Sequence, residues 1–253
     1  MDQPKIVSRD KWLIARKALL VEEKAFTRTR DALARKRLGL PWVKIEKRYF
    51  FNGPNGSETL ADLFAGRSQL IVQHFMFAPG WEEGCVGCSF NADHVDGALP
   101  HIQARDVTFV AVSRAPLSDL ERYRRRMGWG FKWVSSQESD FNYDFNVSFR
   151  KEDIKAGKAL YNYRALEPES DMEDLSGYSS FYKNADGDIF HAYSTFARGD
   201  EVLMTAYMYL DLLAPSGRNE DDLDPPMSWW RHHDRYDDAP QGTNSCCATS
   251  PPI

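Results

Sequence analysis

The feature of this sequence with the clearest chemical meaning is a pair of cysteines three positions apart, Cys85 and Cys88. The pair follows a run typical of a buried strand, so it stands where a helix is expected to begin. There the first thiol lies over free backbone N–H groups that stabilise a thiolate, and the second lies one helical turn further on. One thiol can then attack a disulfide while the other releases the bound partner. The pattern therefore predicts thiol–disulfide exchange, with Cys85 attacking and Cys88 resolving.

The same two cysteines also fit two other interpretations. They would bind zinc if two further ligands completed a tetrahedron, and the candidate ligands are His74, His94, His101 and His191. No second C-x-x-C and no pair of histidines at ligand spacing accompanies them, so we favour exchange and predict no metal and no cofactor. The third interpretation is that both sulfurs are inert core atoms, in an interaction scaffold that keeps the fold without turnover.

Two further cysteines, Cys246 and Cys247, stand in a segment of Pro, Gly, Ser and Thr with almost nothing to bury. Residues 237–253 are therefore predicted to form a disordered tail. A tail cysteine that reaches Cys85 would act as an additional resolving thiol. We favour the alternative of an exposed, incidental pair, because tails tolerate most residue types.

Aromatic rings, imidazoles and charges gather just before that tail, in Trp229–Tyr236. One interpretation is a site for an anionic or aromatic ligand, or for a metal. The interpretation that we favour is an amphipathic strap whose two tryptophans cover the core.

Hydrophobic patterns indicate the elements that position the two central cysteines. Gln69–Phe77 is rich in β-branched and aromatic residues, as central strands are. Apolar residues then recur at helical spacing from Cys85 to Leu99. Val107–Val112 is almost wholly apolar, which is typical of a strand buried on both faces, and a helix is expected from Pro116 to Gly128. This order predicts two parallel, neighbouring strands joined by a right-handed crossover.

The second half of the chain adds a hairpin and a helix. Tyr178–Lys183 and Asp188–Thr195 flank Ala185-Asp186-Gly187, a strong hairpin signal, and a helix is expected over Gly199–Leu213. Strand, helix, strand, helix, hairpin and helix is the order of a thioredoxin-like fold. The sequence therefore predicts an α/β protein with a mixed central sheet flanked by helices.

Two other regions give weaker signals. A hairpin of Lys47–Phe51 and Asn55–Thr59 is expected around the turn Asn52-Gly53-Pro54. Residues 129–175 are aromatic and irregular, and within them only a short strand around Trp133–Ser135 is predicted.

A long helix is expected at the start of the chain, from about Asp10 to Leu38, with Ser8 or Asp10 as its cap and Gly39 after its end. Residues 1–48 carry a net charge of +8 and the remainder −13. A basic arm of this kind can bind nucleic acid through its phosphates. We favour the alternative that it is a solvated face or lies on its own acidic body, and predict no nucleic-acid partner.

Length and composition limit the classes of protein to which the chain can belong. Its 253 residues are 42% hydrophobic and 13% aromatic, which excludes disorder throughout. No apolar run approaches the length of a membrane helix and no secretory signal is present, so we predict a cytoplasmic protein without a membrane partner. The expected organisation is a helical arm at 1–45, a thioredoxin-like domain at 46–213, the strap region at 214–236 and the tail.

Several runs together are familiar: HFMFAPGWEEGCVGCSFNAD, HIQARDVTFVAVSRAPLSDLERYRRRMGWGFKWVSS, DFNYDF, GDIFHAYSTFARG and RHHDRY. They closely resemble the thioredoxin-like family catalogued as domain of unknown function eight-nine-nine, over about Arg9 to Tyr236. The resemblance implies a thioredoxin-like core behind a long N-terminal helix. It also implies a thiol–disulfide oxidoreductase whose partners are protein or small-molecule thiols and disulfides.

A more distant resemblance to thioredoxins and peroxiredoxins implies candidate binding residues. Thioredoxins have a tryptophan directly before the first cysteine, whereas Trp81 stands four positions ahead of it. They also have a cis-proline before the hairpin, where this chain has Tyr178 between glycine and serine. Arg114, after the second core strand, is the candidate for an anion or a peroxide. Peroxiredoxins have a threonine at the place of Glu82, so we do not favour a peroxidase.

Overall fold

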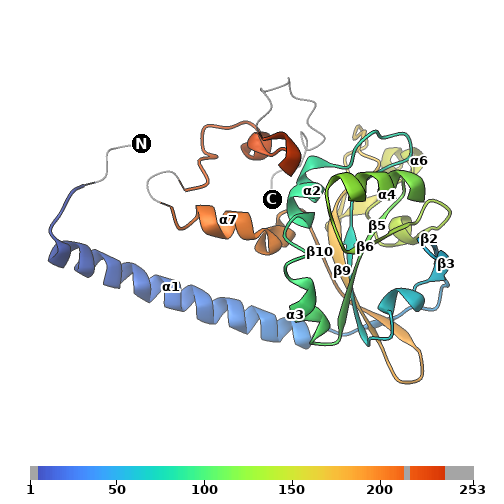
Figure 1. Ribbon diagram of the computed structural model, residues 1–253, viewed down its shortest axis with the longest axis horizontal. Coiled ribbons are helices and arrows are strands. Elements are labelled where there is room, and N and C mark those ends of the chain that lie inside the picture. Colours follow the sequence, from blue (N-terminus) through green and yellow to red (C-terminus); the bar gives the residue numbers. More distant parts are fainter. Residues whose placement is uncertain (1–4, 214–216, 237–253) are drawn as a thin grey trace. The chain divides into compact units, whose positions relative to one another are not determined.

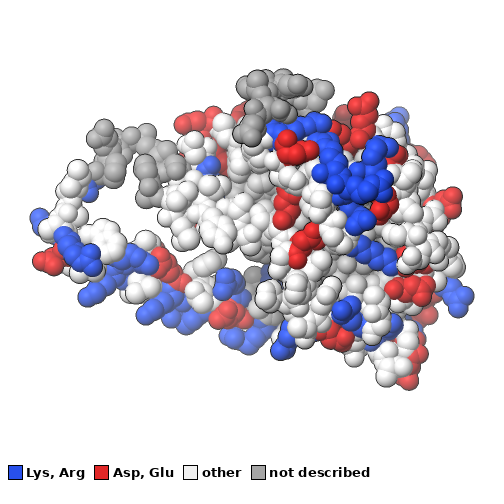
Figure 2. All heavy atoms as spheres, viewed as in Figure 1, with Lys and Arg blue, Asp and Glu red and all other residues white. Residues whose placement is uncertain are grey.

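The computed structural model describes residues 5–213 and 217–236, and the chain divides into two units, Met1–Trp42 and Val43–Ile253 (Figure 1). The predicted tail, with Cys246 and Cys247, lies outside the described residues. The first unit is the helix α1 (Arg9–Leu38), where Ser8 Oγ accepts the N–H of Lys11 at 3.4 Å. Figure 2 shows Lys and Arg along α1 with acidic residues among them. None of the described helices is long and apolar enough to cross a membrane.

The described part of the second unit is built on an eight-stranded sheet. Its strands lie in the order β1 (Val43–Lys44), β10 (Ile189–Phe196), β9 (Gly177–Lys183), β4 (Gln69–His74), β5 (Val107–Ser113), β6 (Lys132–Ser135), β2 (Phe50–Gly53) and β3 (Gly56–Thr59). A separate two-stranded sheet pairs β7 (Leu160–Tyr161) with β8 (Arg164–Ala165).

The four central strands confirm the predicted fold class. β4 and β5 are parallel, with Gln69 opposite Val107, as the crossover argument requires. β9 is antiparallel to β4, and β10 is antiparallel to β9. The order β10-β9-β4-β5 with β9 reversed is that of a thioredoxin-like fold, a mixed sheet flanked by helices.

Alternate residues of the central strands supply two hydrophobic cores, one on each face of the sheet. In β5, Phe109 and Ala111 join the core that contains both cysteines, whereas Val110 and Val112 join the other. Helices α2 (Val86–Ala92), α3 (Leu99–Gln103) and α4 (Leu117–Arg126) contribute to the first core. The short helices η1 (Asp62–Phe64) and α5 (Phe141–Asp144) contribute to the second.

The predicted helix from Cys85 to Leu99 is wrong as one element, because the structure divides it into α2 and α3. The turn between them places the Asp96 carboxylate where it accepts the N–H groups of Gly130 and Phe131, at 2.6 and 3.1 Å. Pro100 then stands in the first turn of α3, where its missing N–H costs nothing. The hydrogen bonds of Asp96 to Gly130 and Phe131 therefore favour a turn at a position where the apolar spacing predicts a continuous helix.

The predicted helix over Gly199–Leu213 is also wrong as one element. The chain instead forms the 3-10 helix η2 (Ala197–Leu203) and, after Met204, the helix α7 (Thr205–Leu210). Met204 leaves the helical conformation, with φ −87° and ψ 82°, and is itself buried. This break turns the carboxyl group of Asp200 inward, and it is likewise buried.

Smaller differences lie at turns and in the irregular region. The first hairpin turns at Pro54-Asn55, before a Gly56 with φ of +104°, rather than around Gly53, which is the last residue of β2. Residues 129–175 contain, besides β6, the elements α5, α6 (Lys151–Lys155), β7 and β8 that no periodicity indicates. After residue 216, two short 3-10 helices follow, η3 (Pro226–Trp229) and η4 (His233–Arg235).

Candidate functional site

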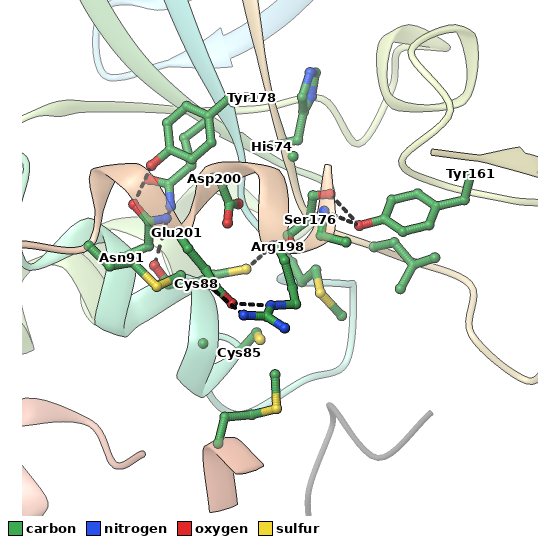
Figure 3. Close-up of a pocket in the computed structure, with 18 of the residues that line it drawn as sticks. His74, Cys85, Cys88, Asn91, Tyr161, Ser176, Tyr178, Arg198, Asp200 and Glu201 are labelled. Carbon is green, nitrogen blue, oxygen red and sulfur yellow. Dashed lines mark hydrogen bonds and ion pairs between the residues drawn. The ribbon is translucent and has the colours of Figure 1, made fainter. Parts of the chain in front are cut away.

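Cys85 and Cys88 line one cavity of about 170 Å³ (Figure 3). Its walls come from the end of β4, from α2, from the start of β9, from η2 and from η3. Thioethers form much of its surface, those of Met76, Met172, Met204 and Met227. Both cysteines are thiols, and only 3% of Cys85 and 4% of Cys88 is exposed.

Met76, just after β4, holds both cysteines through its backbone. Its carbonyl accepts the N–H of Cys85 at 3.0 Å, and its own N–H donates to Cys88 Sγ at 3.4 Å. Cys85 is the N-terminal cap residue of α2, and Cys88 lies within the first turn. Ser89 Oγ donates to the carbonyl of Cys85 at 2.8 Å, and Gln73 Nε2 donates to the carbonyl of Cys88 at 3.2 Å. Both cysteines are thus held to the end of β4 through Met76 and Gln73.

A buried carboxyl group, Asp200, lines the same cavity. Burial raises the pKa of Asp200 to about 7, and the negative charge of Glu201 adds to the rise. Burial also raises the pKa of the Tyr178 phenol, and the charges of Asp200 and Cys88 contribute further. Figure 3 shows Asp200 among the residues around the cavity, together with Tyr178 and Cys88. A carboxyl group that exchanges its proton near neutral pH therefore lines the same cavity as the thiols.

Four residues that line the cavity each have one buried polar side-chain atom without a hydrogen-bond partner among the described residues. These atoms are Gln73 Oε1, His74 Nδ1, Asn91 Nδ2 and Trp230 Nε1. The His74 ring packs against Phe141 and Phe145 of the second core, on the face of the sheet opposite the cysteines. Asn91 Oδ1, in contrast, accepts the hydroxyl of Tyr178 at 2.7 Å. Buried polar atoms are nearly always satisfied in native proteins, so such a group around one cavity points to a ligand.

His74 begins a buried chain of hydrogen bonds that runs across β4, β9 and β10 on the side of the second core. Its Nε2 lies 2.7 Å from Ser179 Oγ, which lies 2.7 Å from Ser194 Oγ, and that oxygen is 2.7 Å from His191 Nε2. Burial lowers the pKa of His74 to about 3, and His191 contributes to the same effect. His74 is therefore neutral at physiological pH.

Charged side chains border the cavity on the side of η2. Arg198 Nε donates to Glu201 Oε1 at 2.7 Å, and Figure 3 shows this ion pair among the lining residues. Arg218 approaches the other carboxylate oxygen of Glu201 at 3.5 Å. The Arg198 guanidinium is thus already paired with the Glu201 carboxylate, which Arg218 also approaches.

Residues 226–236, here called the strap, cover the start of α2. The Trp230 ring stacks on Phe90, with centroids 5.0 Å apart and planes 4° from parallel. His232 Nε2 donates to the carbonyl of Gly84, the residue before Cys85, at 3.1 Å. Met227 and Trp230 both line the cavity. The strap therefore forms part of the cavity wall, through Met227 and Trp230.

Ion pairs fasten the strap to the body of the domain. Arg126 Nε donates to Asp234 Oδ2 at 2.8 Å and Arg126 Nη1 to Glu83 Oε1 at 2.6 Å, while Arg235 also pairs with Glu83. Burial acts to raise the pKa of Glu83, but the bonds from Arg126 and Arg235 outweigh it and lower that pKa. His233 adds a contact to Asp93 Oδ1 at 2.6 Å.

The structure brings together three of the five residues expected at the site. Cys85, Cys88 and Tyr178 line the cavity. Trp81 packs, half-buried, against the core that contains the cysteines, and is not among the lining residues. Arg114 is not brought to the cavity, because its Nε donates to Asp174 Oδ1 at 2.8 Å and its Nη1 to Tyr143 Oη at 3.0 Å.

The candidate zinc ligands do not gather at the thiols. His74 and His191 belong to the hydrogen-bonded chain, and His94 Nε2 accepts the N–H of Ala206 at 3.1 Å. Among residues 5–213 and 217–236, no three His, Cys, Asp or Glu side chains are grouped to hold a metal ion. Of these four histidines only His74 is among the residues that line the cavity, and its ring packs against Phe141 and Phe145 in the second core.

Sequence reasoning missed Asp200, Gln73 and Asn91. Asp200 stands near the start of the helix predicted over Gly199–Leu213, and nothing in the sequence relates it to Cys88. Gln73 gave a usable signal, because a glutamine within the apolar run QLIVQH must be paired or face a cavity.

Comparisons with solved structures give distant likenesses. A bacterioferritin comigratory protein from Xanthomonas campestris is 14% identical, over 62% of this chain and 88% of that chain, with a TM-score of 0.41. The peroxidoxin BcpB from Mycobacterium tuberculosis is 14% identical, over 65% and 94%, also at 0.41. The reduced 2-Cys peroxiredoxin from Plasmodium vivax is 13% identical, over 68% and 96%, at 0.38.

A search of curated proteins finds no match. The model of one family, described as a bacterial protein of unknown function (DUF899), matches residues 1–236. That match takes in α1, the whole described sheet, both cavity cysteines and the strap. The chain therefore belongs to the DUF899 family.

Proposed function

We propose that this protein catalyses thiol–disulfide exchange in the cavity that Cys85 and Cys88 line. The observation that carries the proposal is the convergence of two thiols, three positions apart, and the buried carboxyl of Asp200 on one cavity. Two thiols and a proton acceptor are the groups that exchange requires. The backbone of Met76 bonds to both cysteines. These bonds hold Cys88 in place for the second displacement, in which it attacks Cys85.

The reaction consists of two displacements. The thiolate of Cys85 attacks one sulfur of a substrate disulfide, the substrate S–S bond breaks, and the first substrate thiolate leaves. Cys88 then attacks Cys85 Sγ, which releases the second substrate thiolate and leaves a Cys85–Cys88 disulfide. The substrate gains two electrons and the protein loses two. Cys85 attacks first in this scheme because it precedes α2. Cys88 lies within the helix, and its sulfur accepts a hydrogen bond from the backbone N–H of Met76.

Asp200 serves as the proton acceptor for these steps. Each thiol must lose a proton before its sulfur attacks, and each leaving thiolate takes one up. A carboxyl whose pKa is about 7 exchanges protons readily near neutral pH, which an ordinary aspartate with its pKa near 3.8 does not. The cytoplasm, whose thiol pool would return the disulfide to two thiols, is the compartment that we propose.

The test uses trapping of the mixed disulfide. In a Cys246→Ser/Cys247→Ser background, Cys88→Ser should keep the second substrate thiol bound to Cys85 as a mixed disulfide, because no resolving thiol remains. The matched Cys85→Ser variant should give no such adduct and should lower the exchange rate at least about 100-fold. Mass analysis of the intact protein and of its peptides locates the adduct. Equal adducts on both variants, or none on either, would overturn the proposal.

The same samples test the alternatives. Near-stoichiometric zinc in freshly purified protein, lost in either cysteine variant, would support a metal-binding module instead. A scaffold would show neither adduct nor metal and would keep its cellular role with both thiols changed to alanine. A peroxidase finds little support, because Glu82 is exposed and Arg114 is held by Asp174.

A further inference from the structure

We infer that the site takes small organic disulfides that carry a hydroxyl or amide group, and that the strap excludes the disulfides of folded proteins. This inference rests on the proposed exchange function and names its substrate class. Four features of the molecule carry it: the burial of the thiols, the size of the cavity, the cover over it and the polar atoms in its wall.

Burial limits what can touch the sulfurs. Exchange requires a substrate sulfur to come into contact with Cys85 Sγ, yet Cys85 is 3% and Cys88 4% exposed. The exposure that remains faces the cavity, since both residues line it. A disulfide must therefore enter the cavity, and a folded protein would have to insert a segment of its chain to present one.

The inner part of the cavity is small, and the cavity is partly open to solvent. An apolar cavity of about 150 Å³ holds one benzene molecule, so 170 Å³ accommodates a fragment of roughly six to eight non-hydrogen atoms. That is the size of a short alkyl disulfide. A cystine bridge within a folded protein brings two backbone segments with it, and these would have to remain at the mouth of the cavity while the sulfurs reach Cys85.

The strap closes the approach on the side of α2. Met227 and Trp230 line the cavity from the strap, and the His232 ring bonds to the carbonyl next to Cys85. Asp234 and Arg235 fix the strap through ion pairs to Arg126 and Glu83. A partner protein would have to displace these contacts before it reached either sulfur.

Polar atoms of the lining residues favour some small disulfides over others. Asn91 Nδ2 is a donor and Gln73 Oε1 an acceptor, both buried, both in lining residues and both without a partner among the described residues. A hydroxyl or amide group both donates and accepts, so it satisfies either atom, and leaving such atoms unpaired is costly. Thioethers of Met76, Met172 and Met204 provide an apolar surface for the alkyl part.

The experiment measures rate constants for oxidation of the reduced Cys246→Ser/Cys247→Ser protein by three disulfides. These are bis(2-hydroxyethyl) disulfide, diethyl disulfide and the disulfide of a folded protein, each normalised to its rate with dithiothreitol. We expect the hydroxyethyl compound to react about 10-fold faster than diethyl disulfide, as one hydrogen bond implies. We expect the protein disulfide to react about 100-fold more slowly. Equal normalised rates would overturn the inference, whereas no reaction with any disulfide would overturn the proposed function itself.

A strap variant separates the cover from the cavity. Asp234→Asn/Arg235→Gln removes two anchors of the strap and is expected to raise the rate with the protein disulfide about 10-fold, with little change for the hydroxyethyl compound. Arg122→Gln, which breaks the surface pair with Asp119 on α4, is the matched control and should change neither rate. If the strap variant unfolds, alkylation of the parent protein decides: iodoacetamide should modify Cys85 and a maleimide on a polyethylene glycol chain should not. Equal modification by both reagents would contradict the inference.

Discussion

The two faces of β4 and β5 lead to buried polar clusters of opposite character. Around Arg114, the Asp174 carboxylate accepts from Arg114 Nε at 2.8 Å and from Ser148 Oγ at 2.6 Å, and Tyr143 takes another guanidinium N–H. Around the thiols, Gln73 and Asn91 keep unpartnered atoms among the described residues, and Asp200 has a pKa raised to about 7.

This difference separates structure from function. A buried charge is tolerated when its partners are complete, so the Arg114 cluster ties the loop after β5 to the irregular region at Asp174 and holds the fold. Incomplete partners and a raised carboxyl pKa cost stability, and they are typical of sites that bind or react. Arg114 is the more conspicuous charged residue in the sequence, but Asp200 is the one that lines the cavity with the two cysteines.

The largest effect expected on stability comes from breaking the complete cluster. Arg114→Met leaves the Asp174 carboxylate buried with its ion pair gone, so we expect a loss of about 3–5 kcal/mol in the free energy of unfolding. The rate of thiol exchange per folded molecule should stay unchanged, because the cluster does not line the cavity. Urea unfolding and exchange kinetics on the same sample check both. A loss of exchange with unchanged stability would place Arg114 in the site after all.

The opposite effect is expected at Asp200. Its pKa is raised from 3.8 to about 7, so the folded protein keeps a proton that the unfolded chain releases between these values. Stability therefore falls as the pH rises from about 4 to 7, and Asp200→Asn removes this fall. The variant should exceed the parent by up to about 4 kcal/mol at pH 8, with the advantage vanishing near pH 4. Its exchange rate near pH 7 should nevertheless drop, because the proton acceptor is gone.

Asp62 provides a control of opposite sign. Hydrogen bonds from Thr59 lower the pKa of this exposed carboxyl. Asp62→Asn should therefore lose stability at neutral pH and match the parent only at pH values below the lowered pKa. Unfolding in urea from pH 4 to 8 compares the two variants directly. A flat pH dependence for Asp200→Asn relative to the parent would show that the Asp200 carboxyl is not held in a desolvated state.

The comparison also explains what the sequence can predict. Val107–Val112 is apolar at every position but one, and a run buried on both faces can only be a central strand, so the parallel pair was predictable. The two cysteines of the C-x-x-C pair are close in sequence, and their place after the strand Gln69–His74 follows from chain order. Asp200, in contrast, is 112 positions from Cys88, and the partner of Arg114 lies in a stretch without periodicity. Asp174 comes next to Arg114 only after folding, and so does Asp200 to the cavity that Met204 and Cys88 also line.

The most direct test of the account is a redox titration of the Cys246→Ser/Cys247→Ser protein. Samples equilibrated across a series of thiol–disulfide buffers are alkylated and analysed by mass, so that Cys85 and Cys88 are scored separately. We expect both thiols to disappear together, as one two-electron couple, with conversion to a Cys85–Cys88 disulfide at potentials found in cells. This expectation would be contradicted if the two residues remained thiols at every such potential, or if each reacted independently of the other.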